Sequence, residues 1–139
     1  MFVYGFCNKL TMKNVLKSVL FAIYLVSSAC ALTPQEVVDT GYRYSFESNL
    51  EPKEAALCIS RAAENENTIF QPFIRELDNN GAVELIVKII SGSSTTIVVG
   101  HFFPITSGSK AKMWITNQPL YISKERLYDI LISGCAPRM

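Results

Sequence analysis

Residues 69–90 read IFQPFIRELDNNGAVELIVKII, and this stretch decides the fold. Two runs rich in β-branched and aromatic residues, Ile69–Leu77 and Val83–Ile90, flank an Asp-Asn-Asn-Gly segment at 78–81. Such runs around such a turn predict two antiparallel strands joined by a hairpin. Pro72 has no backbone N–H to donate, which indicates that the first run is an edge strand or is bulged at that point.

Two more runs with a period of two follow the hairpin. Thr96–Phe103 comes after a Ser-Gly loop and ends at Pro104, and the Ser-Gly-Ser turn at 107–109 leads into Lys110–Thr116. Strands joined by short turns pair antiparallel. The sequence therefore predicts a four-stranded antiparallel sheet.

Helical periodicity appears on both sides of this sheet. Residues 52–64 start with Pro52 and carry apolar residues on one helical face, and residues 123–135 start with Ser123, a suitable N-cap. Upstream, Thr33-Pro34-Gln35-Glu36 has the capping-box pattern and predicts a short helix to about Thr40. The predicted fold is a two-layer α+β sandwich of order α-β-β-β-β-α, preceded by a short N-terminal helix.

The composition is that of one folded domain. The chain has 139 residues, of which 49% are hydrophobic and 18% charged, and a formal net charge of +1. This balance excludes a nucleic-acid binder that works through a basic surface, and it argues against a disordered chain. Residues 32–139 form the predicted domain, with ten Lys or Arg against twelve Asp or Glu, a formal charge of −2.

Residues 1–31 have the layout of a bacterial export signal. From Met12 onward, two lysines precede an apolar run at Val19–Val26, which is followed by small residues. The apolar run is far shorter than the about 20 residues that a membrane-spanning helix needs. We expect Met12 to be the true start, in which case Cys7 is never translated.

Two cleavage patterns coincide at the end of this signal. Ala29-Cys30-Ala31 fits the A-x-A motif of an ordinary signal peptidase, giving a soluble mature protein that begins at Leu32. Ser27-Ser28-Ala29-Cys30 resembles a lipoprotein box in which Cys30 carries the lipid, although Ser27 stands where an aliphatic residue is usual. Either reading places the protein outside the cytoplasm, in the periplasm or on an envelope membrane.

Cys58 and Cys135 remain in the mature chain. Exported proteins meet an oxidising compartment, and an even pair of cysteines there indicates a disulfide. Both cysteines lie on the predicted core side of their helices. The sequence has no Cys-x-x-Cys spacing that would suggest a redox pair instead.

The chain resembles a loose group of small, uncharacterised envelope proteins of proteobacteria. The resemblance rests on the leader ending in Ala-Cys, the helix at 56–64, the Gly108-Ser109 turn before the last strand, and the terminal segment 131–135. It implies an envelope location and a disulfide between the helix and the C-terminal segment. It carries no activity and no catalytic motif.

Motifs for chemistry are weak. His101 is the single histidine and lies inside a predicted strand, which favours a structural or surface role. Residues 76–81 resemble the start of a calcium loop, but the twelfth position is Val87 rather than Glu. Ser107 and Ser109 are not in a nucleophile-elbow motif. We therefore expect no catalytic residue, no cofactor and no metal.

Aromatic residues offer a better surface. Tyr42, Tyr44 and Phe46 alternate with polar residues, and Trp114 lies in a predicted strand. They are either core fillers or an exposed patch that binds a protein partner.

We expect a non-catalytic envelope protein that acts through contacts with another envelope protein, in an accessory, assembly or inhibitor role. The alternative is a small periplasmic hydrolase or ligand-binding protein that uses His101 and the sheet face.

Overall fold

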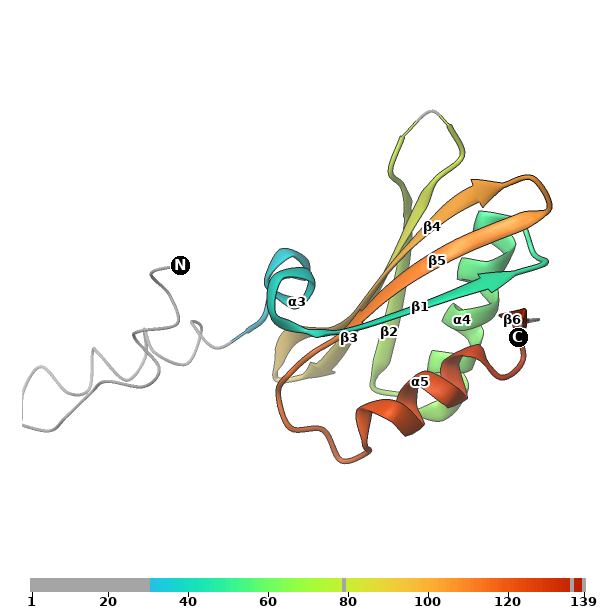
Figure 1. Cartoon of the computed structure of the whole chain (residues 1–139). Coiled ribbons are helices and arrows are strands. Elements are labelled where there is room, and N and C mark those ends of the chain that lie inside the picture. Colours follow the sequence, from blue (N-terminus) through green and yellow to red (C-terminus); the bar gives the residue numbers. More distant parts are fainter. Residues whose placement is uncertain (1–30, 79, 136, 139) are drawn as a thin grey trace, which may run out of the picture. The chain divides into compact units, whose positions relative to one another are not determined.

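The computed structural model describes residues 31–78, 80–135 and 137–138, and it has an α+β fold in which helices pack on an antiparallel sheet (Figure 1). Met12 and Cys30, and with them nearly all of the expected export signal, lie outside the described residues. Within the described part of the chain, no helix is long and apolar enough to cross a membrane. In chain order the elements are α3 (Pro34–Thr40), β1 (Tyr42–Ser48), α4 (Pro52–Glu66), β2 (Phe70–Glu76), β3 (Val83–Ser91), β4 (Ser93–Ile105), β5 (Gly108–Ile115), α5 (Lys124–Ile132) and β6 (Pro137–Arg138).

The sheet has more strands than predicted. Its order is β2-β3-β4-β5-β1-β6, with five long strands and the two-residue β6 at the edge, so the prediction of four strands was wrong. The missed long strand is β1, which pairs with β5 from Tyr42↔Ile115 to Ser48↔Ser109. Its partner lies far along the chain, so no short turn marks the pairing in the sequence.

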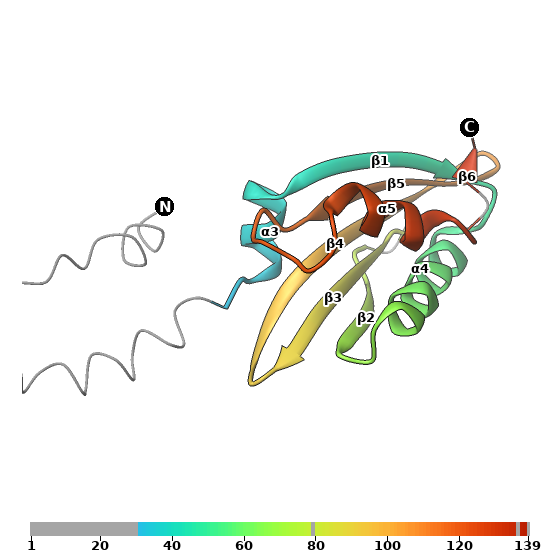
Figure 2. The ribbon, with the colours of Figure 1, turned by 90° about the horizontal axis from the view of Figure 1, so that it is seen from below.

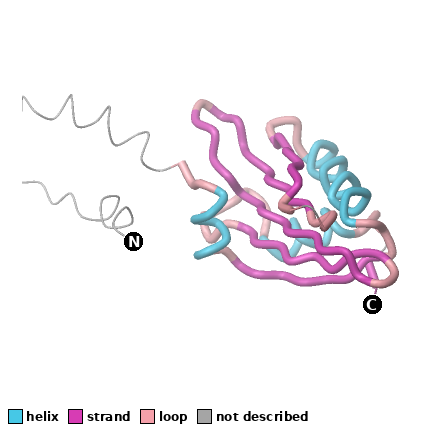
Figure 3. The backbone as a smooth tube through the Cα atoms, turned by 90° about the horizontal axis from the view of Figure 1, so that it is seen from above, coloured by secondary structure: helices cyan, strands magenta, loops and turns pink. Residues whose placement is uncertain are grey.

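One face of the sheet, here called the inner face, is covered by α4 and α5. Figure 2 shows both helices on the same side of the curved sheet, and Figure 3 shows α4 beside the layer of strands. Apolar residues from the two helices and from all five long strands form one buried cluster. Its largest fully buried side chains include Phe102, Ile59, Leu85, Met113, Ile115, Leu127 and Leu131.

The predicted disulfide is confirmed. Cys58 on α4 is bonded to Cys135 just after α5, and their Cα atoms are 5.6 Å apart. The hydroxyl of Ser48 on β1 donates to the carbonyl of Cys135 at 2.8 Å and accepts from the backbone N–H of Leu50 at 3.1 Å. The covalent and polar contacts together hold the end of the chain against α4 and β1.

The edge position predicted for the first strand of the hairpin is confirmed, because β2 ends the sheet. Hydrogen bonds from Leu77 N to Ala82 O and from Ile90 N to Ile69 O flank the β2–β3 ladder. In an antiparallel ladder, residues alternate between facing the partner strand and facing away. The backbone groups of Pro72 point away from β3, so its missing N–H costs no ladder bond. The missing donor also leaves the open edge a poorer template for another strand.

On the opposite, outer face, the helix layer is replaced by the short α3. The capping box predicted at its start is confirmed, since the side chains and backbones of Thr33 and Glu36 bond reciprocally. Just before it, Leu32 is fixed to β4 by hydrogen bonds between its N–H and the Thr95 hydroxyl and between the Thr96 N–H and its carbonyl. These bonds place α3 on the outer face, where Val37 is its buried residue.

Candidate functional site

A polar row crosses the outer face of the sheet. In an antiparallel sheet, residues directly opposite each other point to the same face. The register places residues opposite one another through the five strands β1, β5, β4, β3 and β2 in the order Ser45, Lys112, His101, Glu84 and Arg75. The neighbouring row on the same face is Arg43, Trp114, Val99, Ile86 and Phe73.

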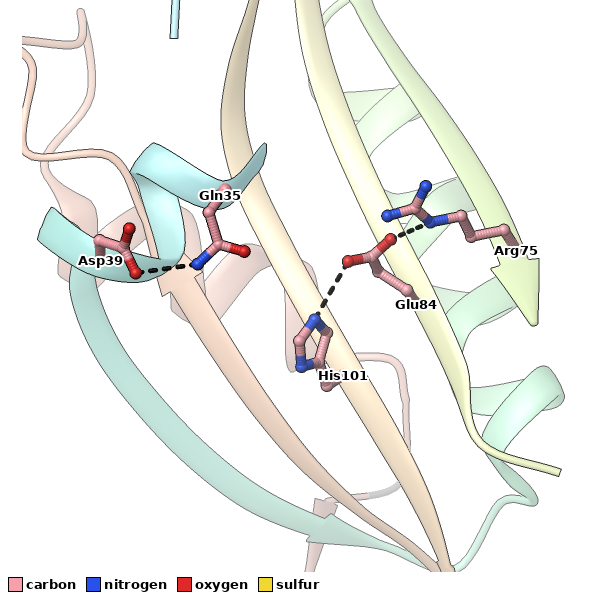
Figure 4. Close-up of polar contacts among 5 residues, drawn as sticks. All are labelled: Gln35, Asp39, Arg75, Glu84 and His101. Atoms are coloured by element: carbon pink, nitrogen blue, oxygen red, sulfur yellow. Dashed lines mark hydrogen bonds and ion pairs between the residues drawn. The ribbon is translucent and has the colours of Figure 1, made fainter. Parts of the chain in front are cut away.

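Glu84 is the centre of the polar row. Its side chain is only 6% exposed, yet both carboxylate oxygens have partners (Figure 4). Oε1 lies 3.1 Å from Nε2 of His101, and Oε2 accepts from Nε of Arg75. A buried carboxylate is costly unless such donors satisfy it, so the three side chains from β2, β3 and β4 form one unit.

The His101 ring is held by its neighbours. The carboxylate of Glu84 accepts a hydrogen bond from Nε2 of His101. In the neutral ring Nε2 therefore carries the proton, and Nδ1 is an acceptor. The ring packs edge-on against Trp114, with centroids 5.0 Å apart, and against Phe103 at 6.3 Å. The histidine is thus fixed on a framework of strands.

A recess of about 310 Å³ opens beside this unit, under the start of α3. Thr33 contributes the one hydroxyl among the described residues that line it, and that oxygen already donates to the Glu36 carboxylate and accepts from the Glu36 N–H. The amide of Gln35 donates to Asp39 (Figure 4). The lining residues are Thr33, Pro34, Gln35, Val38, Arg75, Glu84 and His101.

The recess therefore offers an imidazole, a carboxylate and a guanidinium, but its lining supplies no uncommitted nucleophile. The serines considered from the sequence do not supply one either. Ser109 is buried opposite Ser48 on the inner face, and Ser107 lies in the turn between β4 and β5. Among the described residues, no group of three or more His, Cys, Asp or Glu could hold a metal ion.

The structure separates the four partner-binding candidates. Phe46 is buried in the inner core, and Tyr44 stacks on Tyr128 of α5 with ring centroids 4.4 Å apart. Burial, with a smaller effect from Glu125, raises the pKa of Tyr44. Tyr42 is 54% exposed, while Trp114 lies half-buried on the outer face. The four side chains therefore do not form one patch.

Other exposed apolar residues were missed by sequence reasoning. Phe73 on β2 is 49% exposed on the outer face, and Ile90 at the end of β3 follows the same alternation. Ile69 and Leu77 at the two ends of β2 are exposed as well. Residues 69–77 are apolar at positions of both parities, so the sequence alone does not show which set meets the helices. The signal that could have revealed this surface was the presence of apolar residues on both faces of the hairpin.

Basic side chains accompany the aromatic rings on this face. The ammonium of Lys88 lies 5.6 Å from the centroid of the Phe73 ring, and that of Lys112 lies 5.8 Å from the centroid of Phe103. The two lysine–phenylalanine pairs lie on the same face of the sheet as Glu84. The outer face therefore combines aromatic surface with positive charge.

No protein-family model matches this chain. No curated protein matches it either. Among solved structures, the crystal structure of Ara h 8.0201 is similar at 12% identity, over 66% of this chain and 87% of that one, with a TM-score of 0.24. A similarity at that level supports no inference about function, so the function is argued from the chain itself.

Proposed function

We propose that this protein is a non-catalytic, exported cell-envelope protein that acts through contacts with another envelope protein, in an accessory, assembly or inhibitor role. The observation that carries this proposal is the outer face of the sheet. It presents exposed apolar side chains, Phe73 and Ile90 among them, beside polar and basic ones. Exposed apolar groups bordered by polar residues are typical of surfaces that bind a partner.

The recess at Glu84 supports the non-catalytic part of the proposal. Hydrolysis by covalent catalysis through a histidine needs a side-chain nucleophile within hydrogen-bond reach of the ring. The hydroxyl in the lining, that of Thr33, is committed to the cap of α3. The Glu84–His101 pair is better explained as satisfaction of a buried carboxylate.

The disulfide supports the exported part. Disulfides persist in oxidising compartments and are rare in the cytosol, and Cys58–Cys135 closes a loop with a sequence separation of 77 residues. Leu32, the first residue of one proposed mature form, is hydrogen-bonded to Thr95 and Thr96 of β4 and so belongs to the folded domain. Intact mass of the mature protein distinguishes them: lipidation adds a diacylglycerol-sized excess on Cys30, and simple cleavage leaves Leu32 as the first residue.

Chemical crosslinking in intact cells, followed by fractionation and mass spectrometry, tests the function. We expect the protein in the envelope fraction, crosslinked repeatedly to the same envelope protein. Recovery in the cytoplasm, or crosslinks spread over abundant proteins in proportion to their amounts, would overturn the proposal.

A second candidate function is binding of a small ligand in the recess of about 310 Å³, because Glu84, His101 and Arg75 converge there. Screening of small amines and small carboxylates by NMR tests it. Binding requires saturable shifts at the amides of His101 and Val38, which Val38→Trp would remove by filling the recess. Absence of saturable shifts with every compound would argue against this second candidate.

A further inference from the structure

We propose that the binding surface for the partner is the outer face of the sheet, and that the partner presents an acidic protein surface interspersed with apolar side chains. This inference rests on the proposed function and adds the location and the chemistry of the contact. The surface is defined by its aromatic and basic side chains from β1 to β5, which are Arg43, Phe73, Arg75, Lys88, Phe103, Lys110, Lys112 and Trp114.

Charge is distributed unequally between the two layers. The outer face of the sheet carries five of the ten basic residues of the domain but only two carboxylates, Glu47 and Glu84. Glu84 is buried and already bonded to Arg75 and His101, and Glu47 lies 3.9 Å from Lys110. Within the described chain, Arg43, Lys88 and Lys112 form no ion pair with a carboxylate.

The helix layer has the opposite character. In α4 and α5 with their caps, acidic residues outnumber basic ones. The same is true of the domain as a whole. A domain with a formal charge of −2 therefore presents a basic face to one side. Complementary charge steers association and selects the partner, so this face fits an acidic surface better than a neutral or basic one.

The position of α3 limits the docking surface. Glu36 and Asp39 on α3 add negative charge where that helix covers the sheet, and both are engaged in contacts within α3. The two cation–ring pairs, Lys88–Phe73 and Lys112–Phe103, are not among the residues that line the recess under α3. Each pair offers an apolar ring beside a cation, which suits a partner segment that combines acidic and apolar side chains.

Site-specific photocrosslinking in cells tests the location. A benzophenone amino acid is placed at Phe73 on the outer face or at Leu57 on α4, which are 49% and 39% exposed. We expect the adduct with the partner from position 73 and not from position 57, with the crosslinked peptide rich in Asp and Glu. An adduct from position 57 alone, a crosslinked peptide that is neutral or basic, or no adduct from position 73 overturns the inference.

Charge reversal supplies a matched control. Lys88→Glu with Lys112→Glu changes the outer face, and Lys53→Glu with Arg61→Glu changes exposed positions of α4 by the same total charge. We expect the first pair to reduce the adduct from position 73 about tenfold and the second to change it less than about twofold, because only the first pair replaces attraction to an acidic partner by repulsion. Equal losses in both double variants overturn the inference.

Defined probes test the chemistry of the partner on the purified domain with its disulfide intact. The probes are a peptide of alternating Glu and Phe, its Lys and Phe counterpart, an oligothymidylate and vesicles of phosphatidylglycerol. We expect the acidic peptide alone to shift outer-face amides, with affinity that falls as salt is added. Binding only to the oligonucleotide or to the vesicles would assign the face to another class of partner and overturn the inference.

The proposed function and this inference fail separately. A constant envelope partner that crosslinks through α4 or α5 keeps the proposed function and removes the outer-face site. Absence of any constant partner in the chemical crosslinking removes both.

Discussion

The two faces of the sheet follow different rules although the same strands build them. On the inner face, Leu85, Phe102 and Met113 belong to one apolar cluster sealed by α4 and α5. On the outer face, Glu84 is buried among donors, while Phe73 is exposed to solvent. The inner face is mainly apolar, whereas the outer face combines charged side chains, aromatic rings and one recess.

The two faces contribute differently to the stability of the fold. Apolar burial accounts for most of the inner face, where the buried polar side chains Ser48 and Ser109 are exceptions. The outer face keeps a buried carboxylate and exposed rings that a stable two-layer fold does not require. Features that stability does not explain are the better candidates for function.

Two adjacent phenylalanines, Phe102 and Phe103, should differ most in their contribution to stability. Phe102 is fully buried on the inner face and Phe103 is half-buried on the outer face. We expect Phe102→Ala to lower the free energy of unfolding by about 3–5 kcal/mol, because it removes a large buried side chain and leaves a cavity. Phe103→Ala should cost less than about 1 kcal/mol. Urea unfolding followed by far-UV circular dichroism measures both.

Near-equal losses in the free energy of unfolding at Phe102 and Phe103 would show that the two faces contribute equally to stability, against the expectation. A second inner-face variant keeps the test informative if Phe102→Ala does not fold. Met113→Ala serves, since Met113 is fully buried opposite Gly100. It should cost about 2–5 kcal/mol.

The disulfide should also make a large contribution to stability on the helix-covered side of the sheet. Cys58→Ala with Cys135→Ala should lower the free energy of unfolding by about 2–5 kcal/mol, because the bond closes a long loop in the unfolded chain. Unfolding of the native protein in reducing and oxidising buffer gives the same quantity without mutation. A double variant as stable as the oxidised native protein would contradict the expectation.

Much of the inner face was predictable, because it obeys local periodicity. The helices at 52–64 and 123–135, the hairpin at 69–90 and the pairing of Cys58 with Cys135 follow from spacing and turn signals that are read within short segments. Pro72 predicted that this strand is an edge strand or is bulged, and β2 is an edge strand.

The outer face was not predictable in the same way, because its contacts join residues distant in sequence. His101 was noticed from the sequence, but its contact with Glu84 depends on the β3–β4 register. The strand β1 was missed because its partner β5 is separated from it by most of the domain. The sequence also did not show that Tyr44 and Trp114 lie on opposite faces, because only the register decides which side chains share a face.

The polar row should affect stability less than the core does. Glu84→Ala removes an acceptor from His101 and Arg75, and we expect a loss of about 1–2 kcal/mol in the free energy of unfolding. Arg75→Ala should cost less than about 1 kcal/mol because its side chain is 64% exposed and remains largely hydrated. Chemical unfolding at neutral pH measures both. A loss at Arg75 that exceeds the loss at Glu84 would contradict this reading.

The smallest expected effect is at α3, which is held on the outer face by its cap and by the segment around Leu32 rather than by a full helix layer. The Thr33 backbone N–H donates to the Glu36 carboxylate at 2.7 Å and, with the Thr33 hydroxyl, lowers the pKa of Glu36 from its ordinary value of 4.5. A carboxylate whose pKa is lower in the folded state stabilises that state above its unfolded pKa. The contribution of Glu36 is therefore present above about pH 4.5 and is lost as the pH falls through the lowered value.

Amide chemical shifts of Thr33, followed by NMR from pH 6 to pH 2, measure this loss. We expect a titration with its midpoint below 4.5 in the native protein and its absence in Glu36→Gln, whose amide keeps a neutral cap at every pH. Because α3 covers only part of the outer face, the signals of inner-face residues such as Phe102 should not follow the same titration. If the inner core follows Glu36, α3 is coupled to the whole domain, and the two faces are less independent than their chemistry indicates.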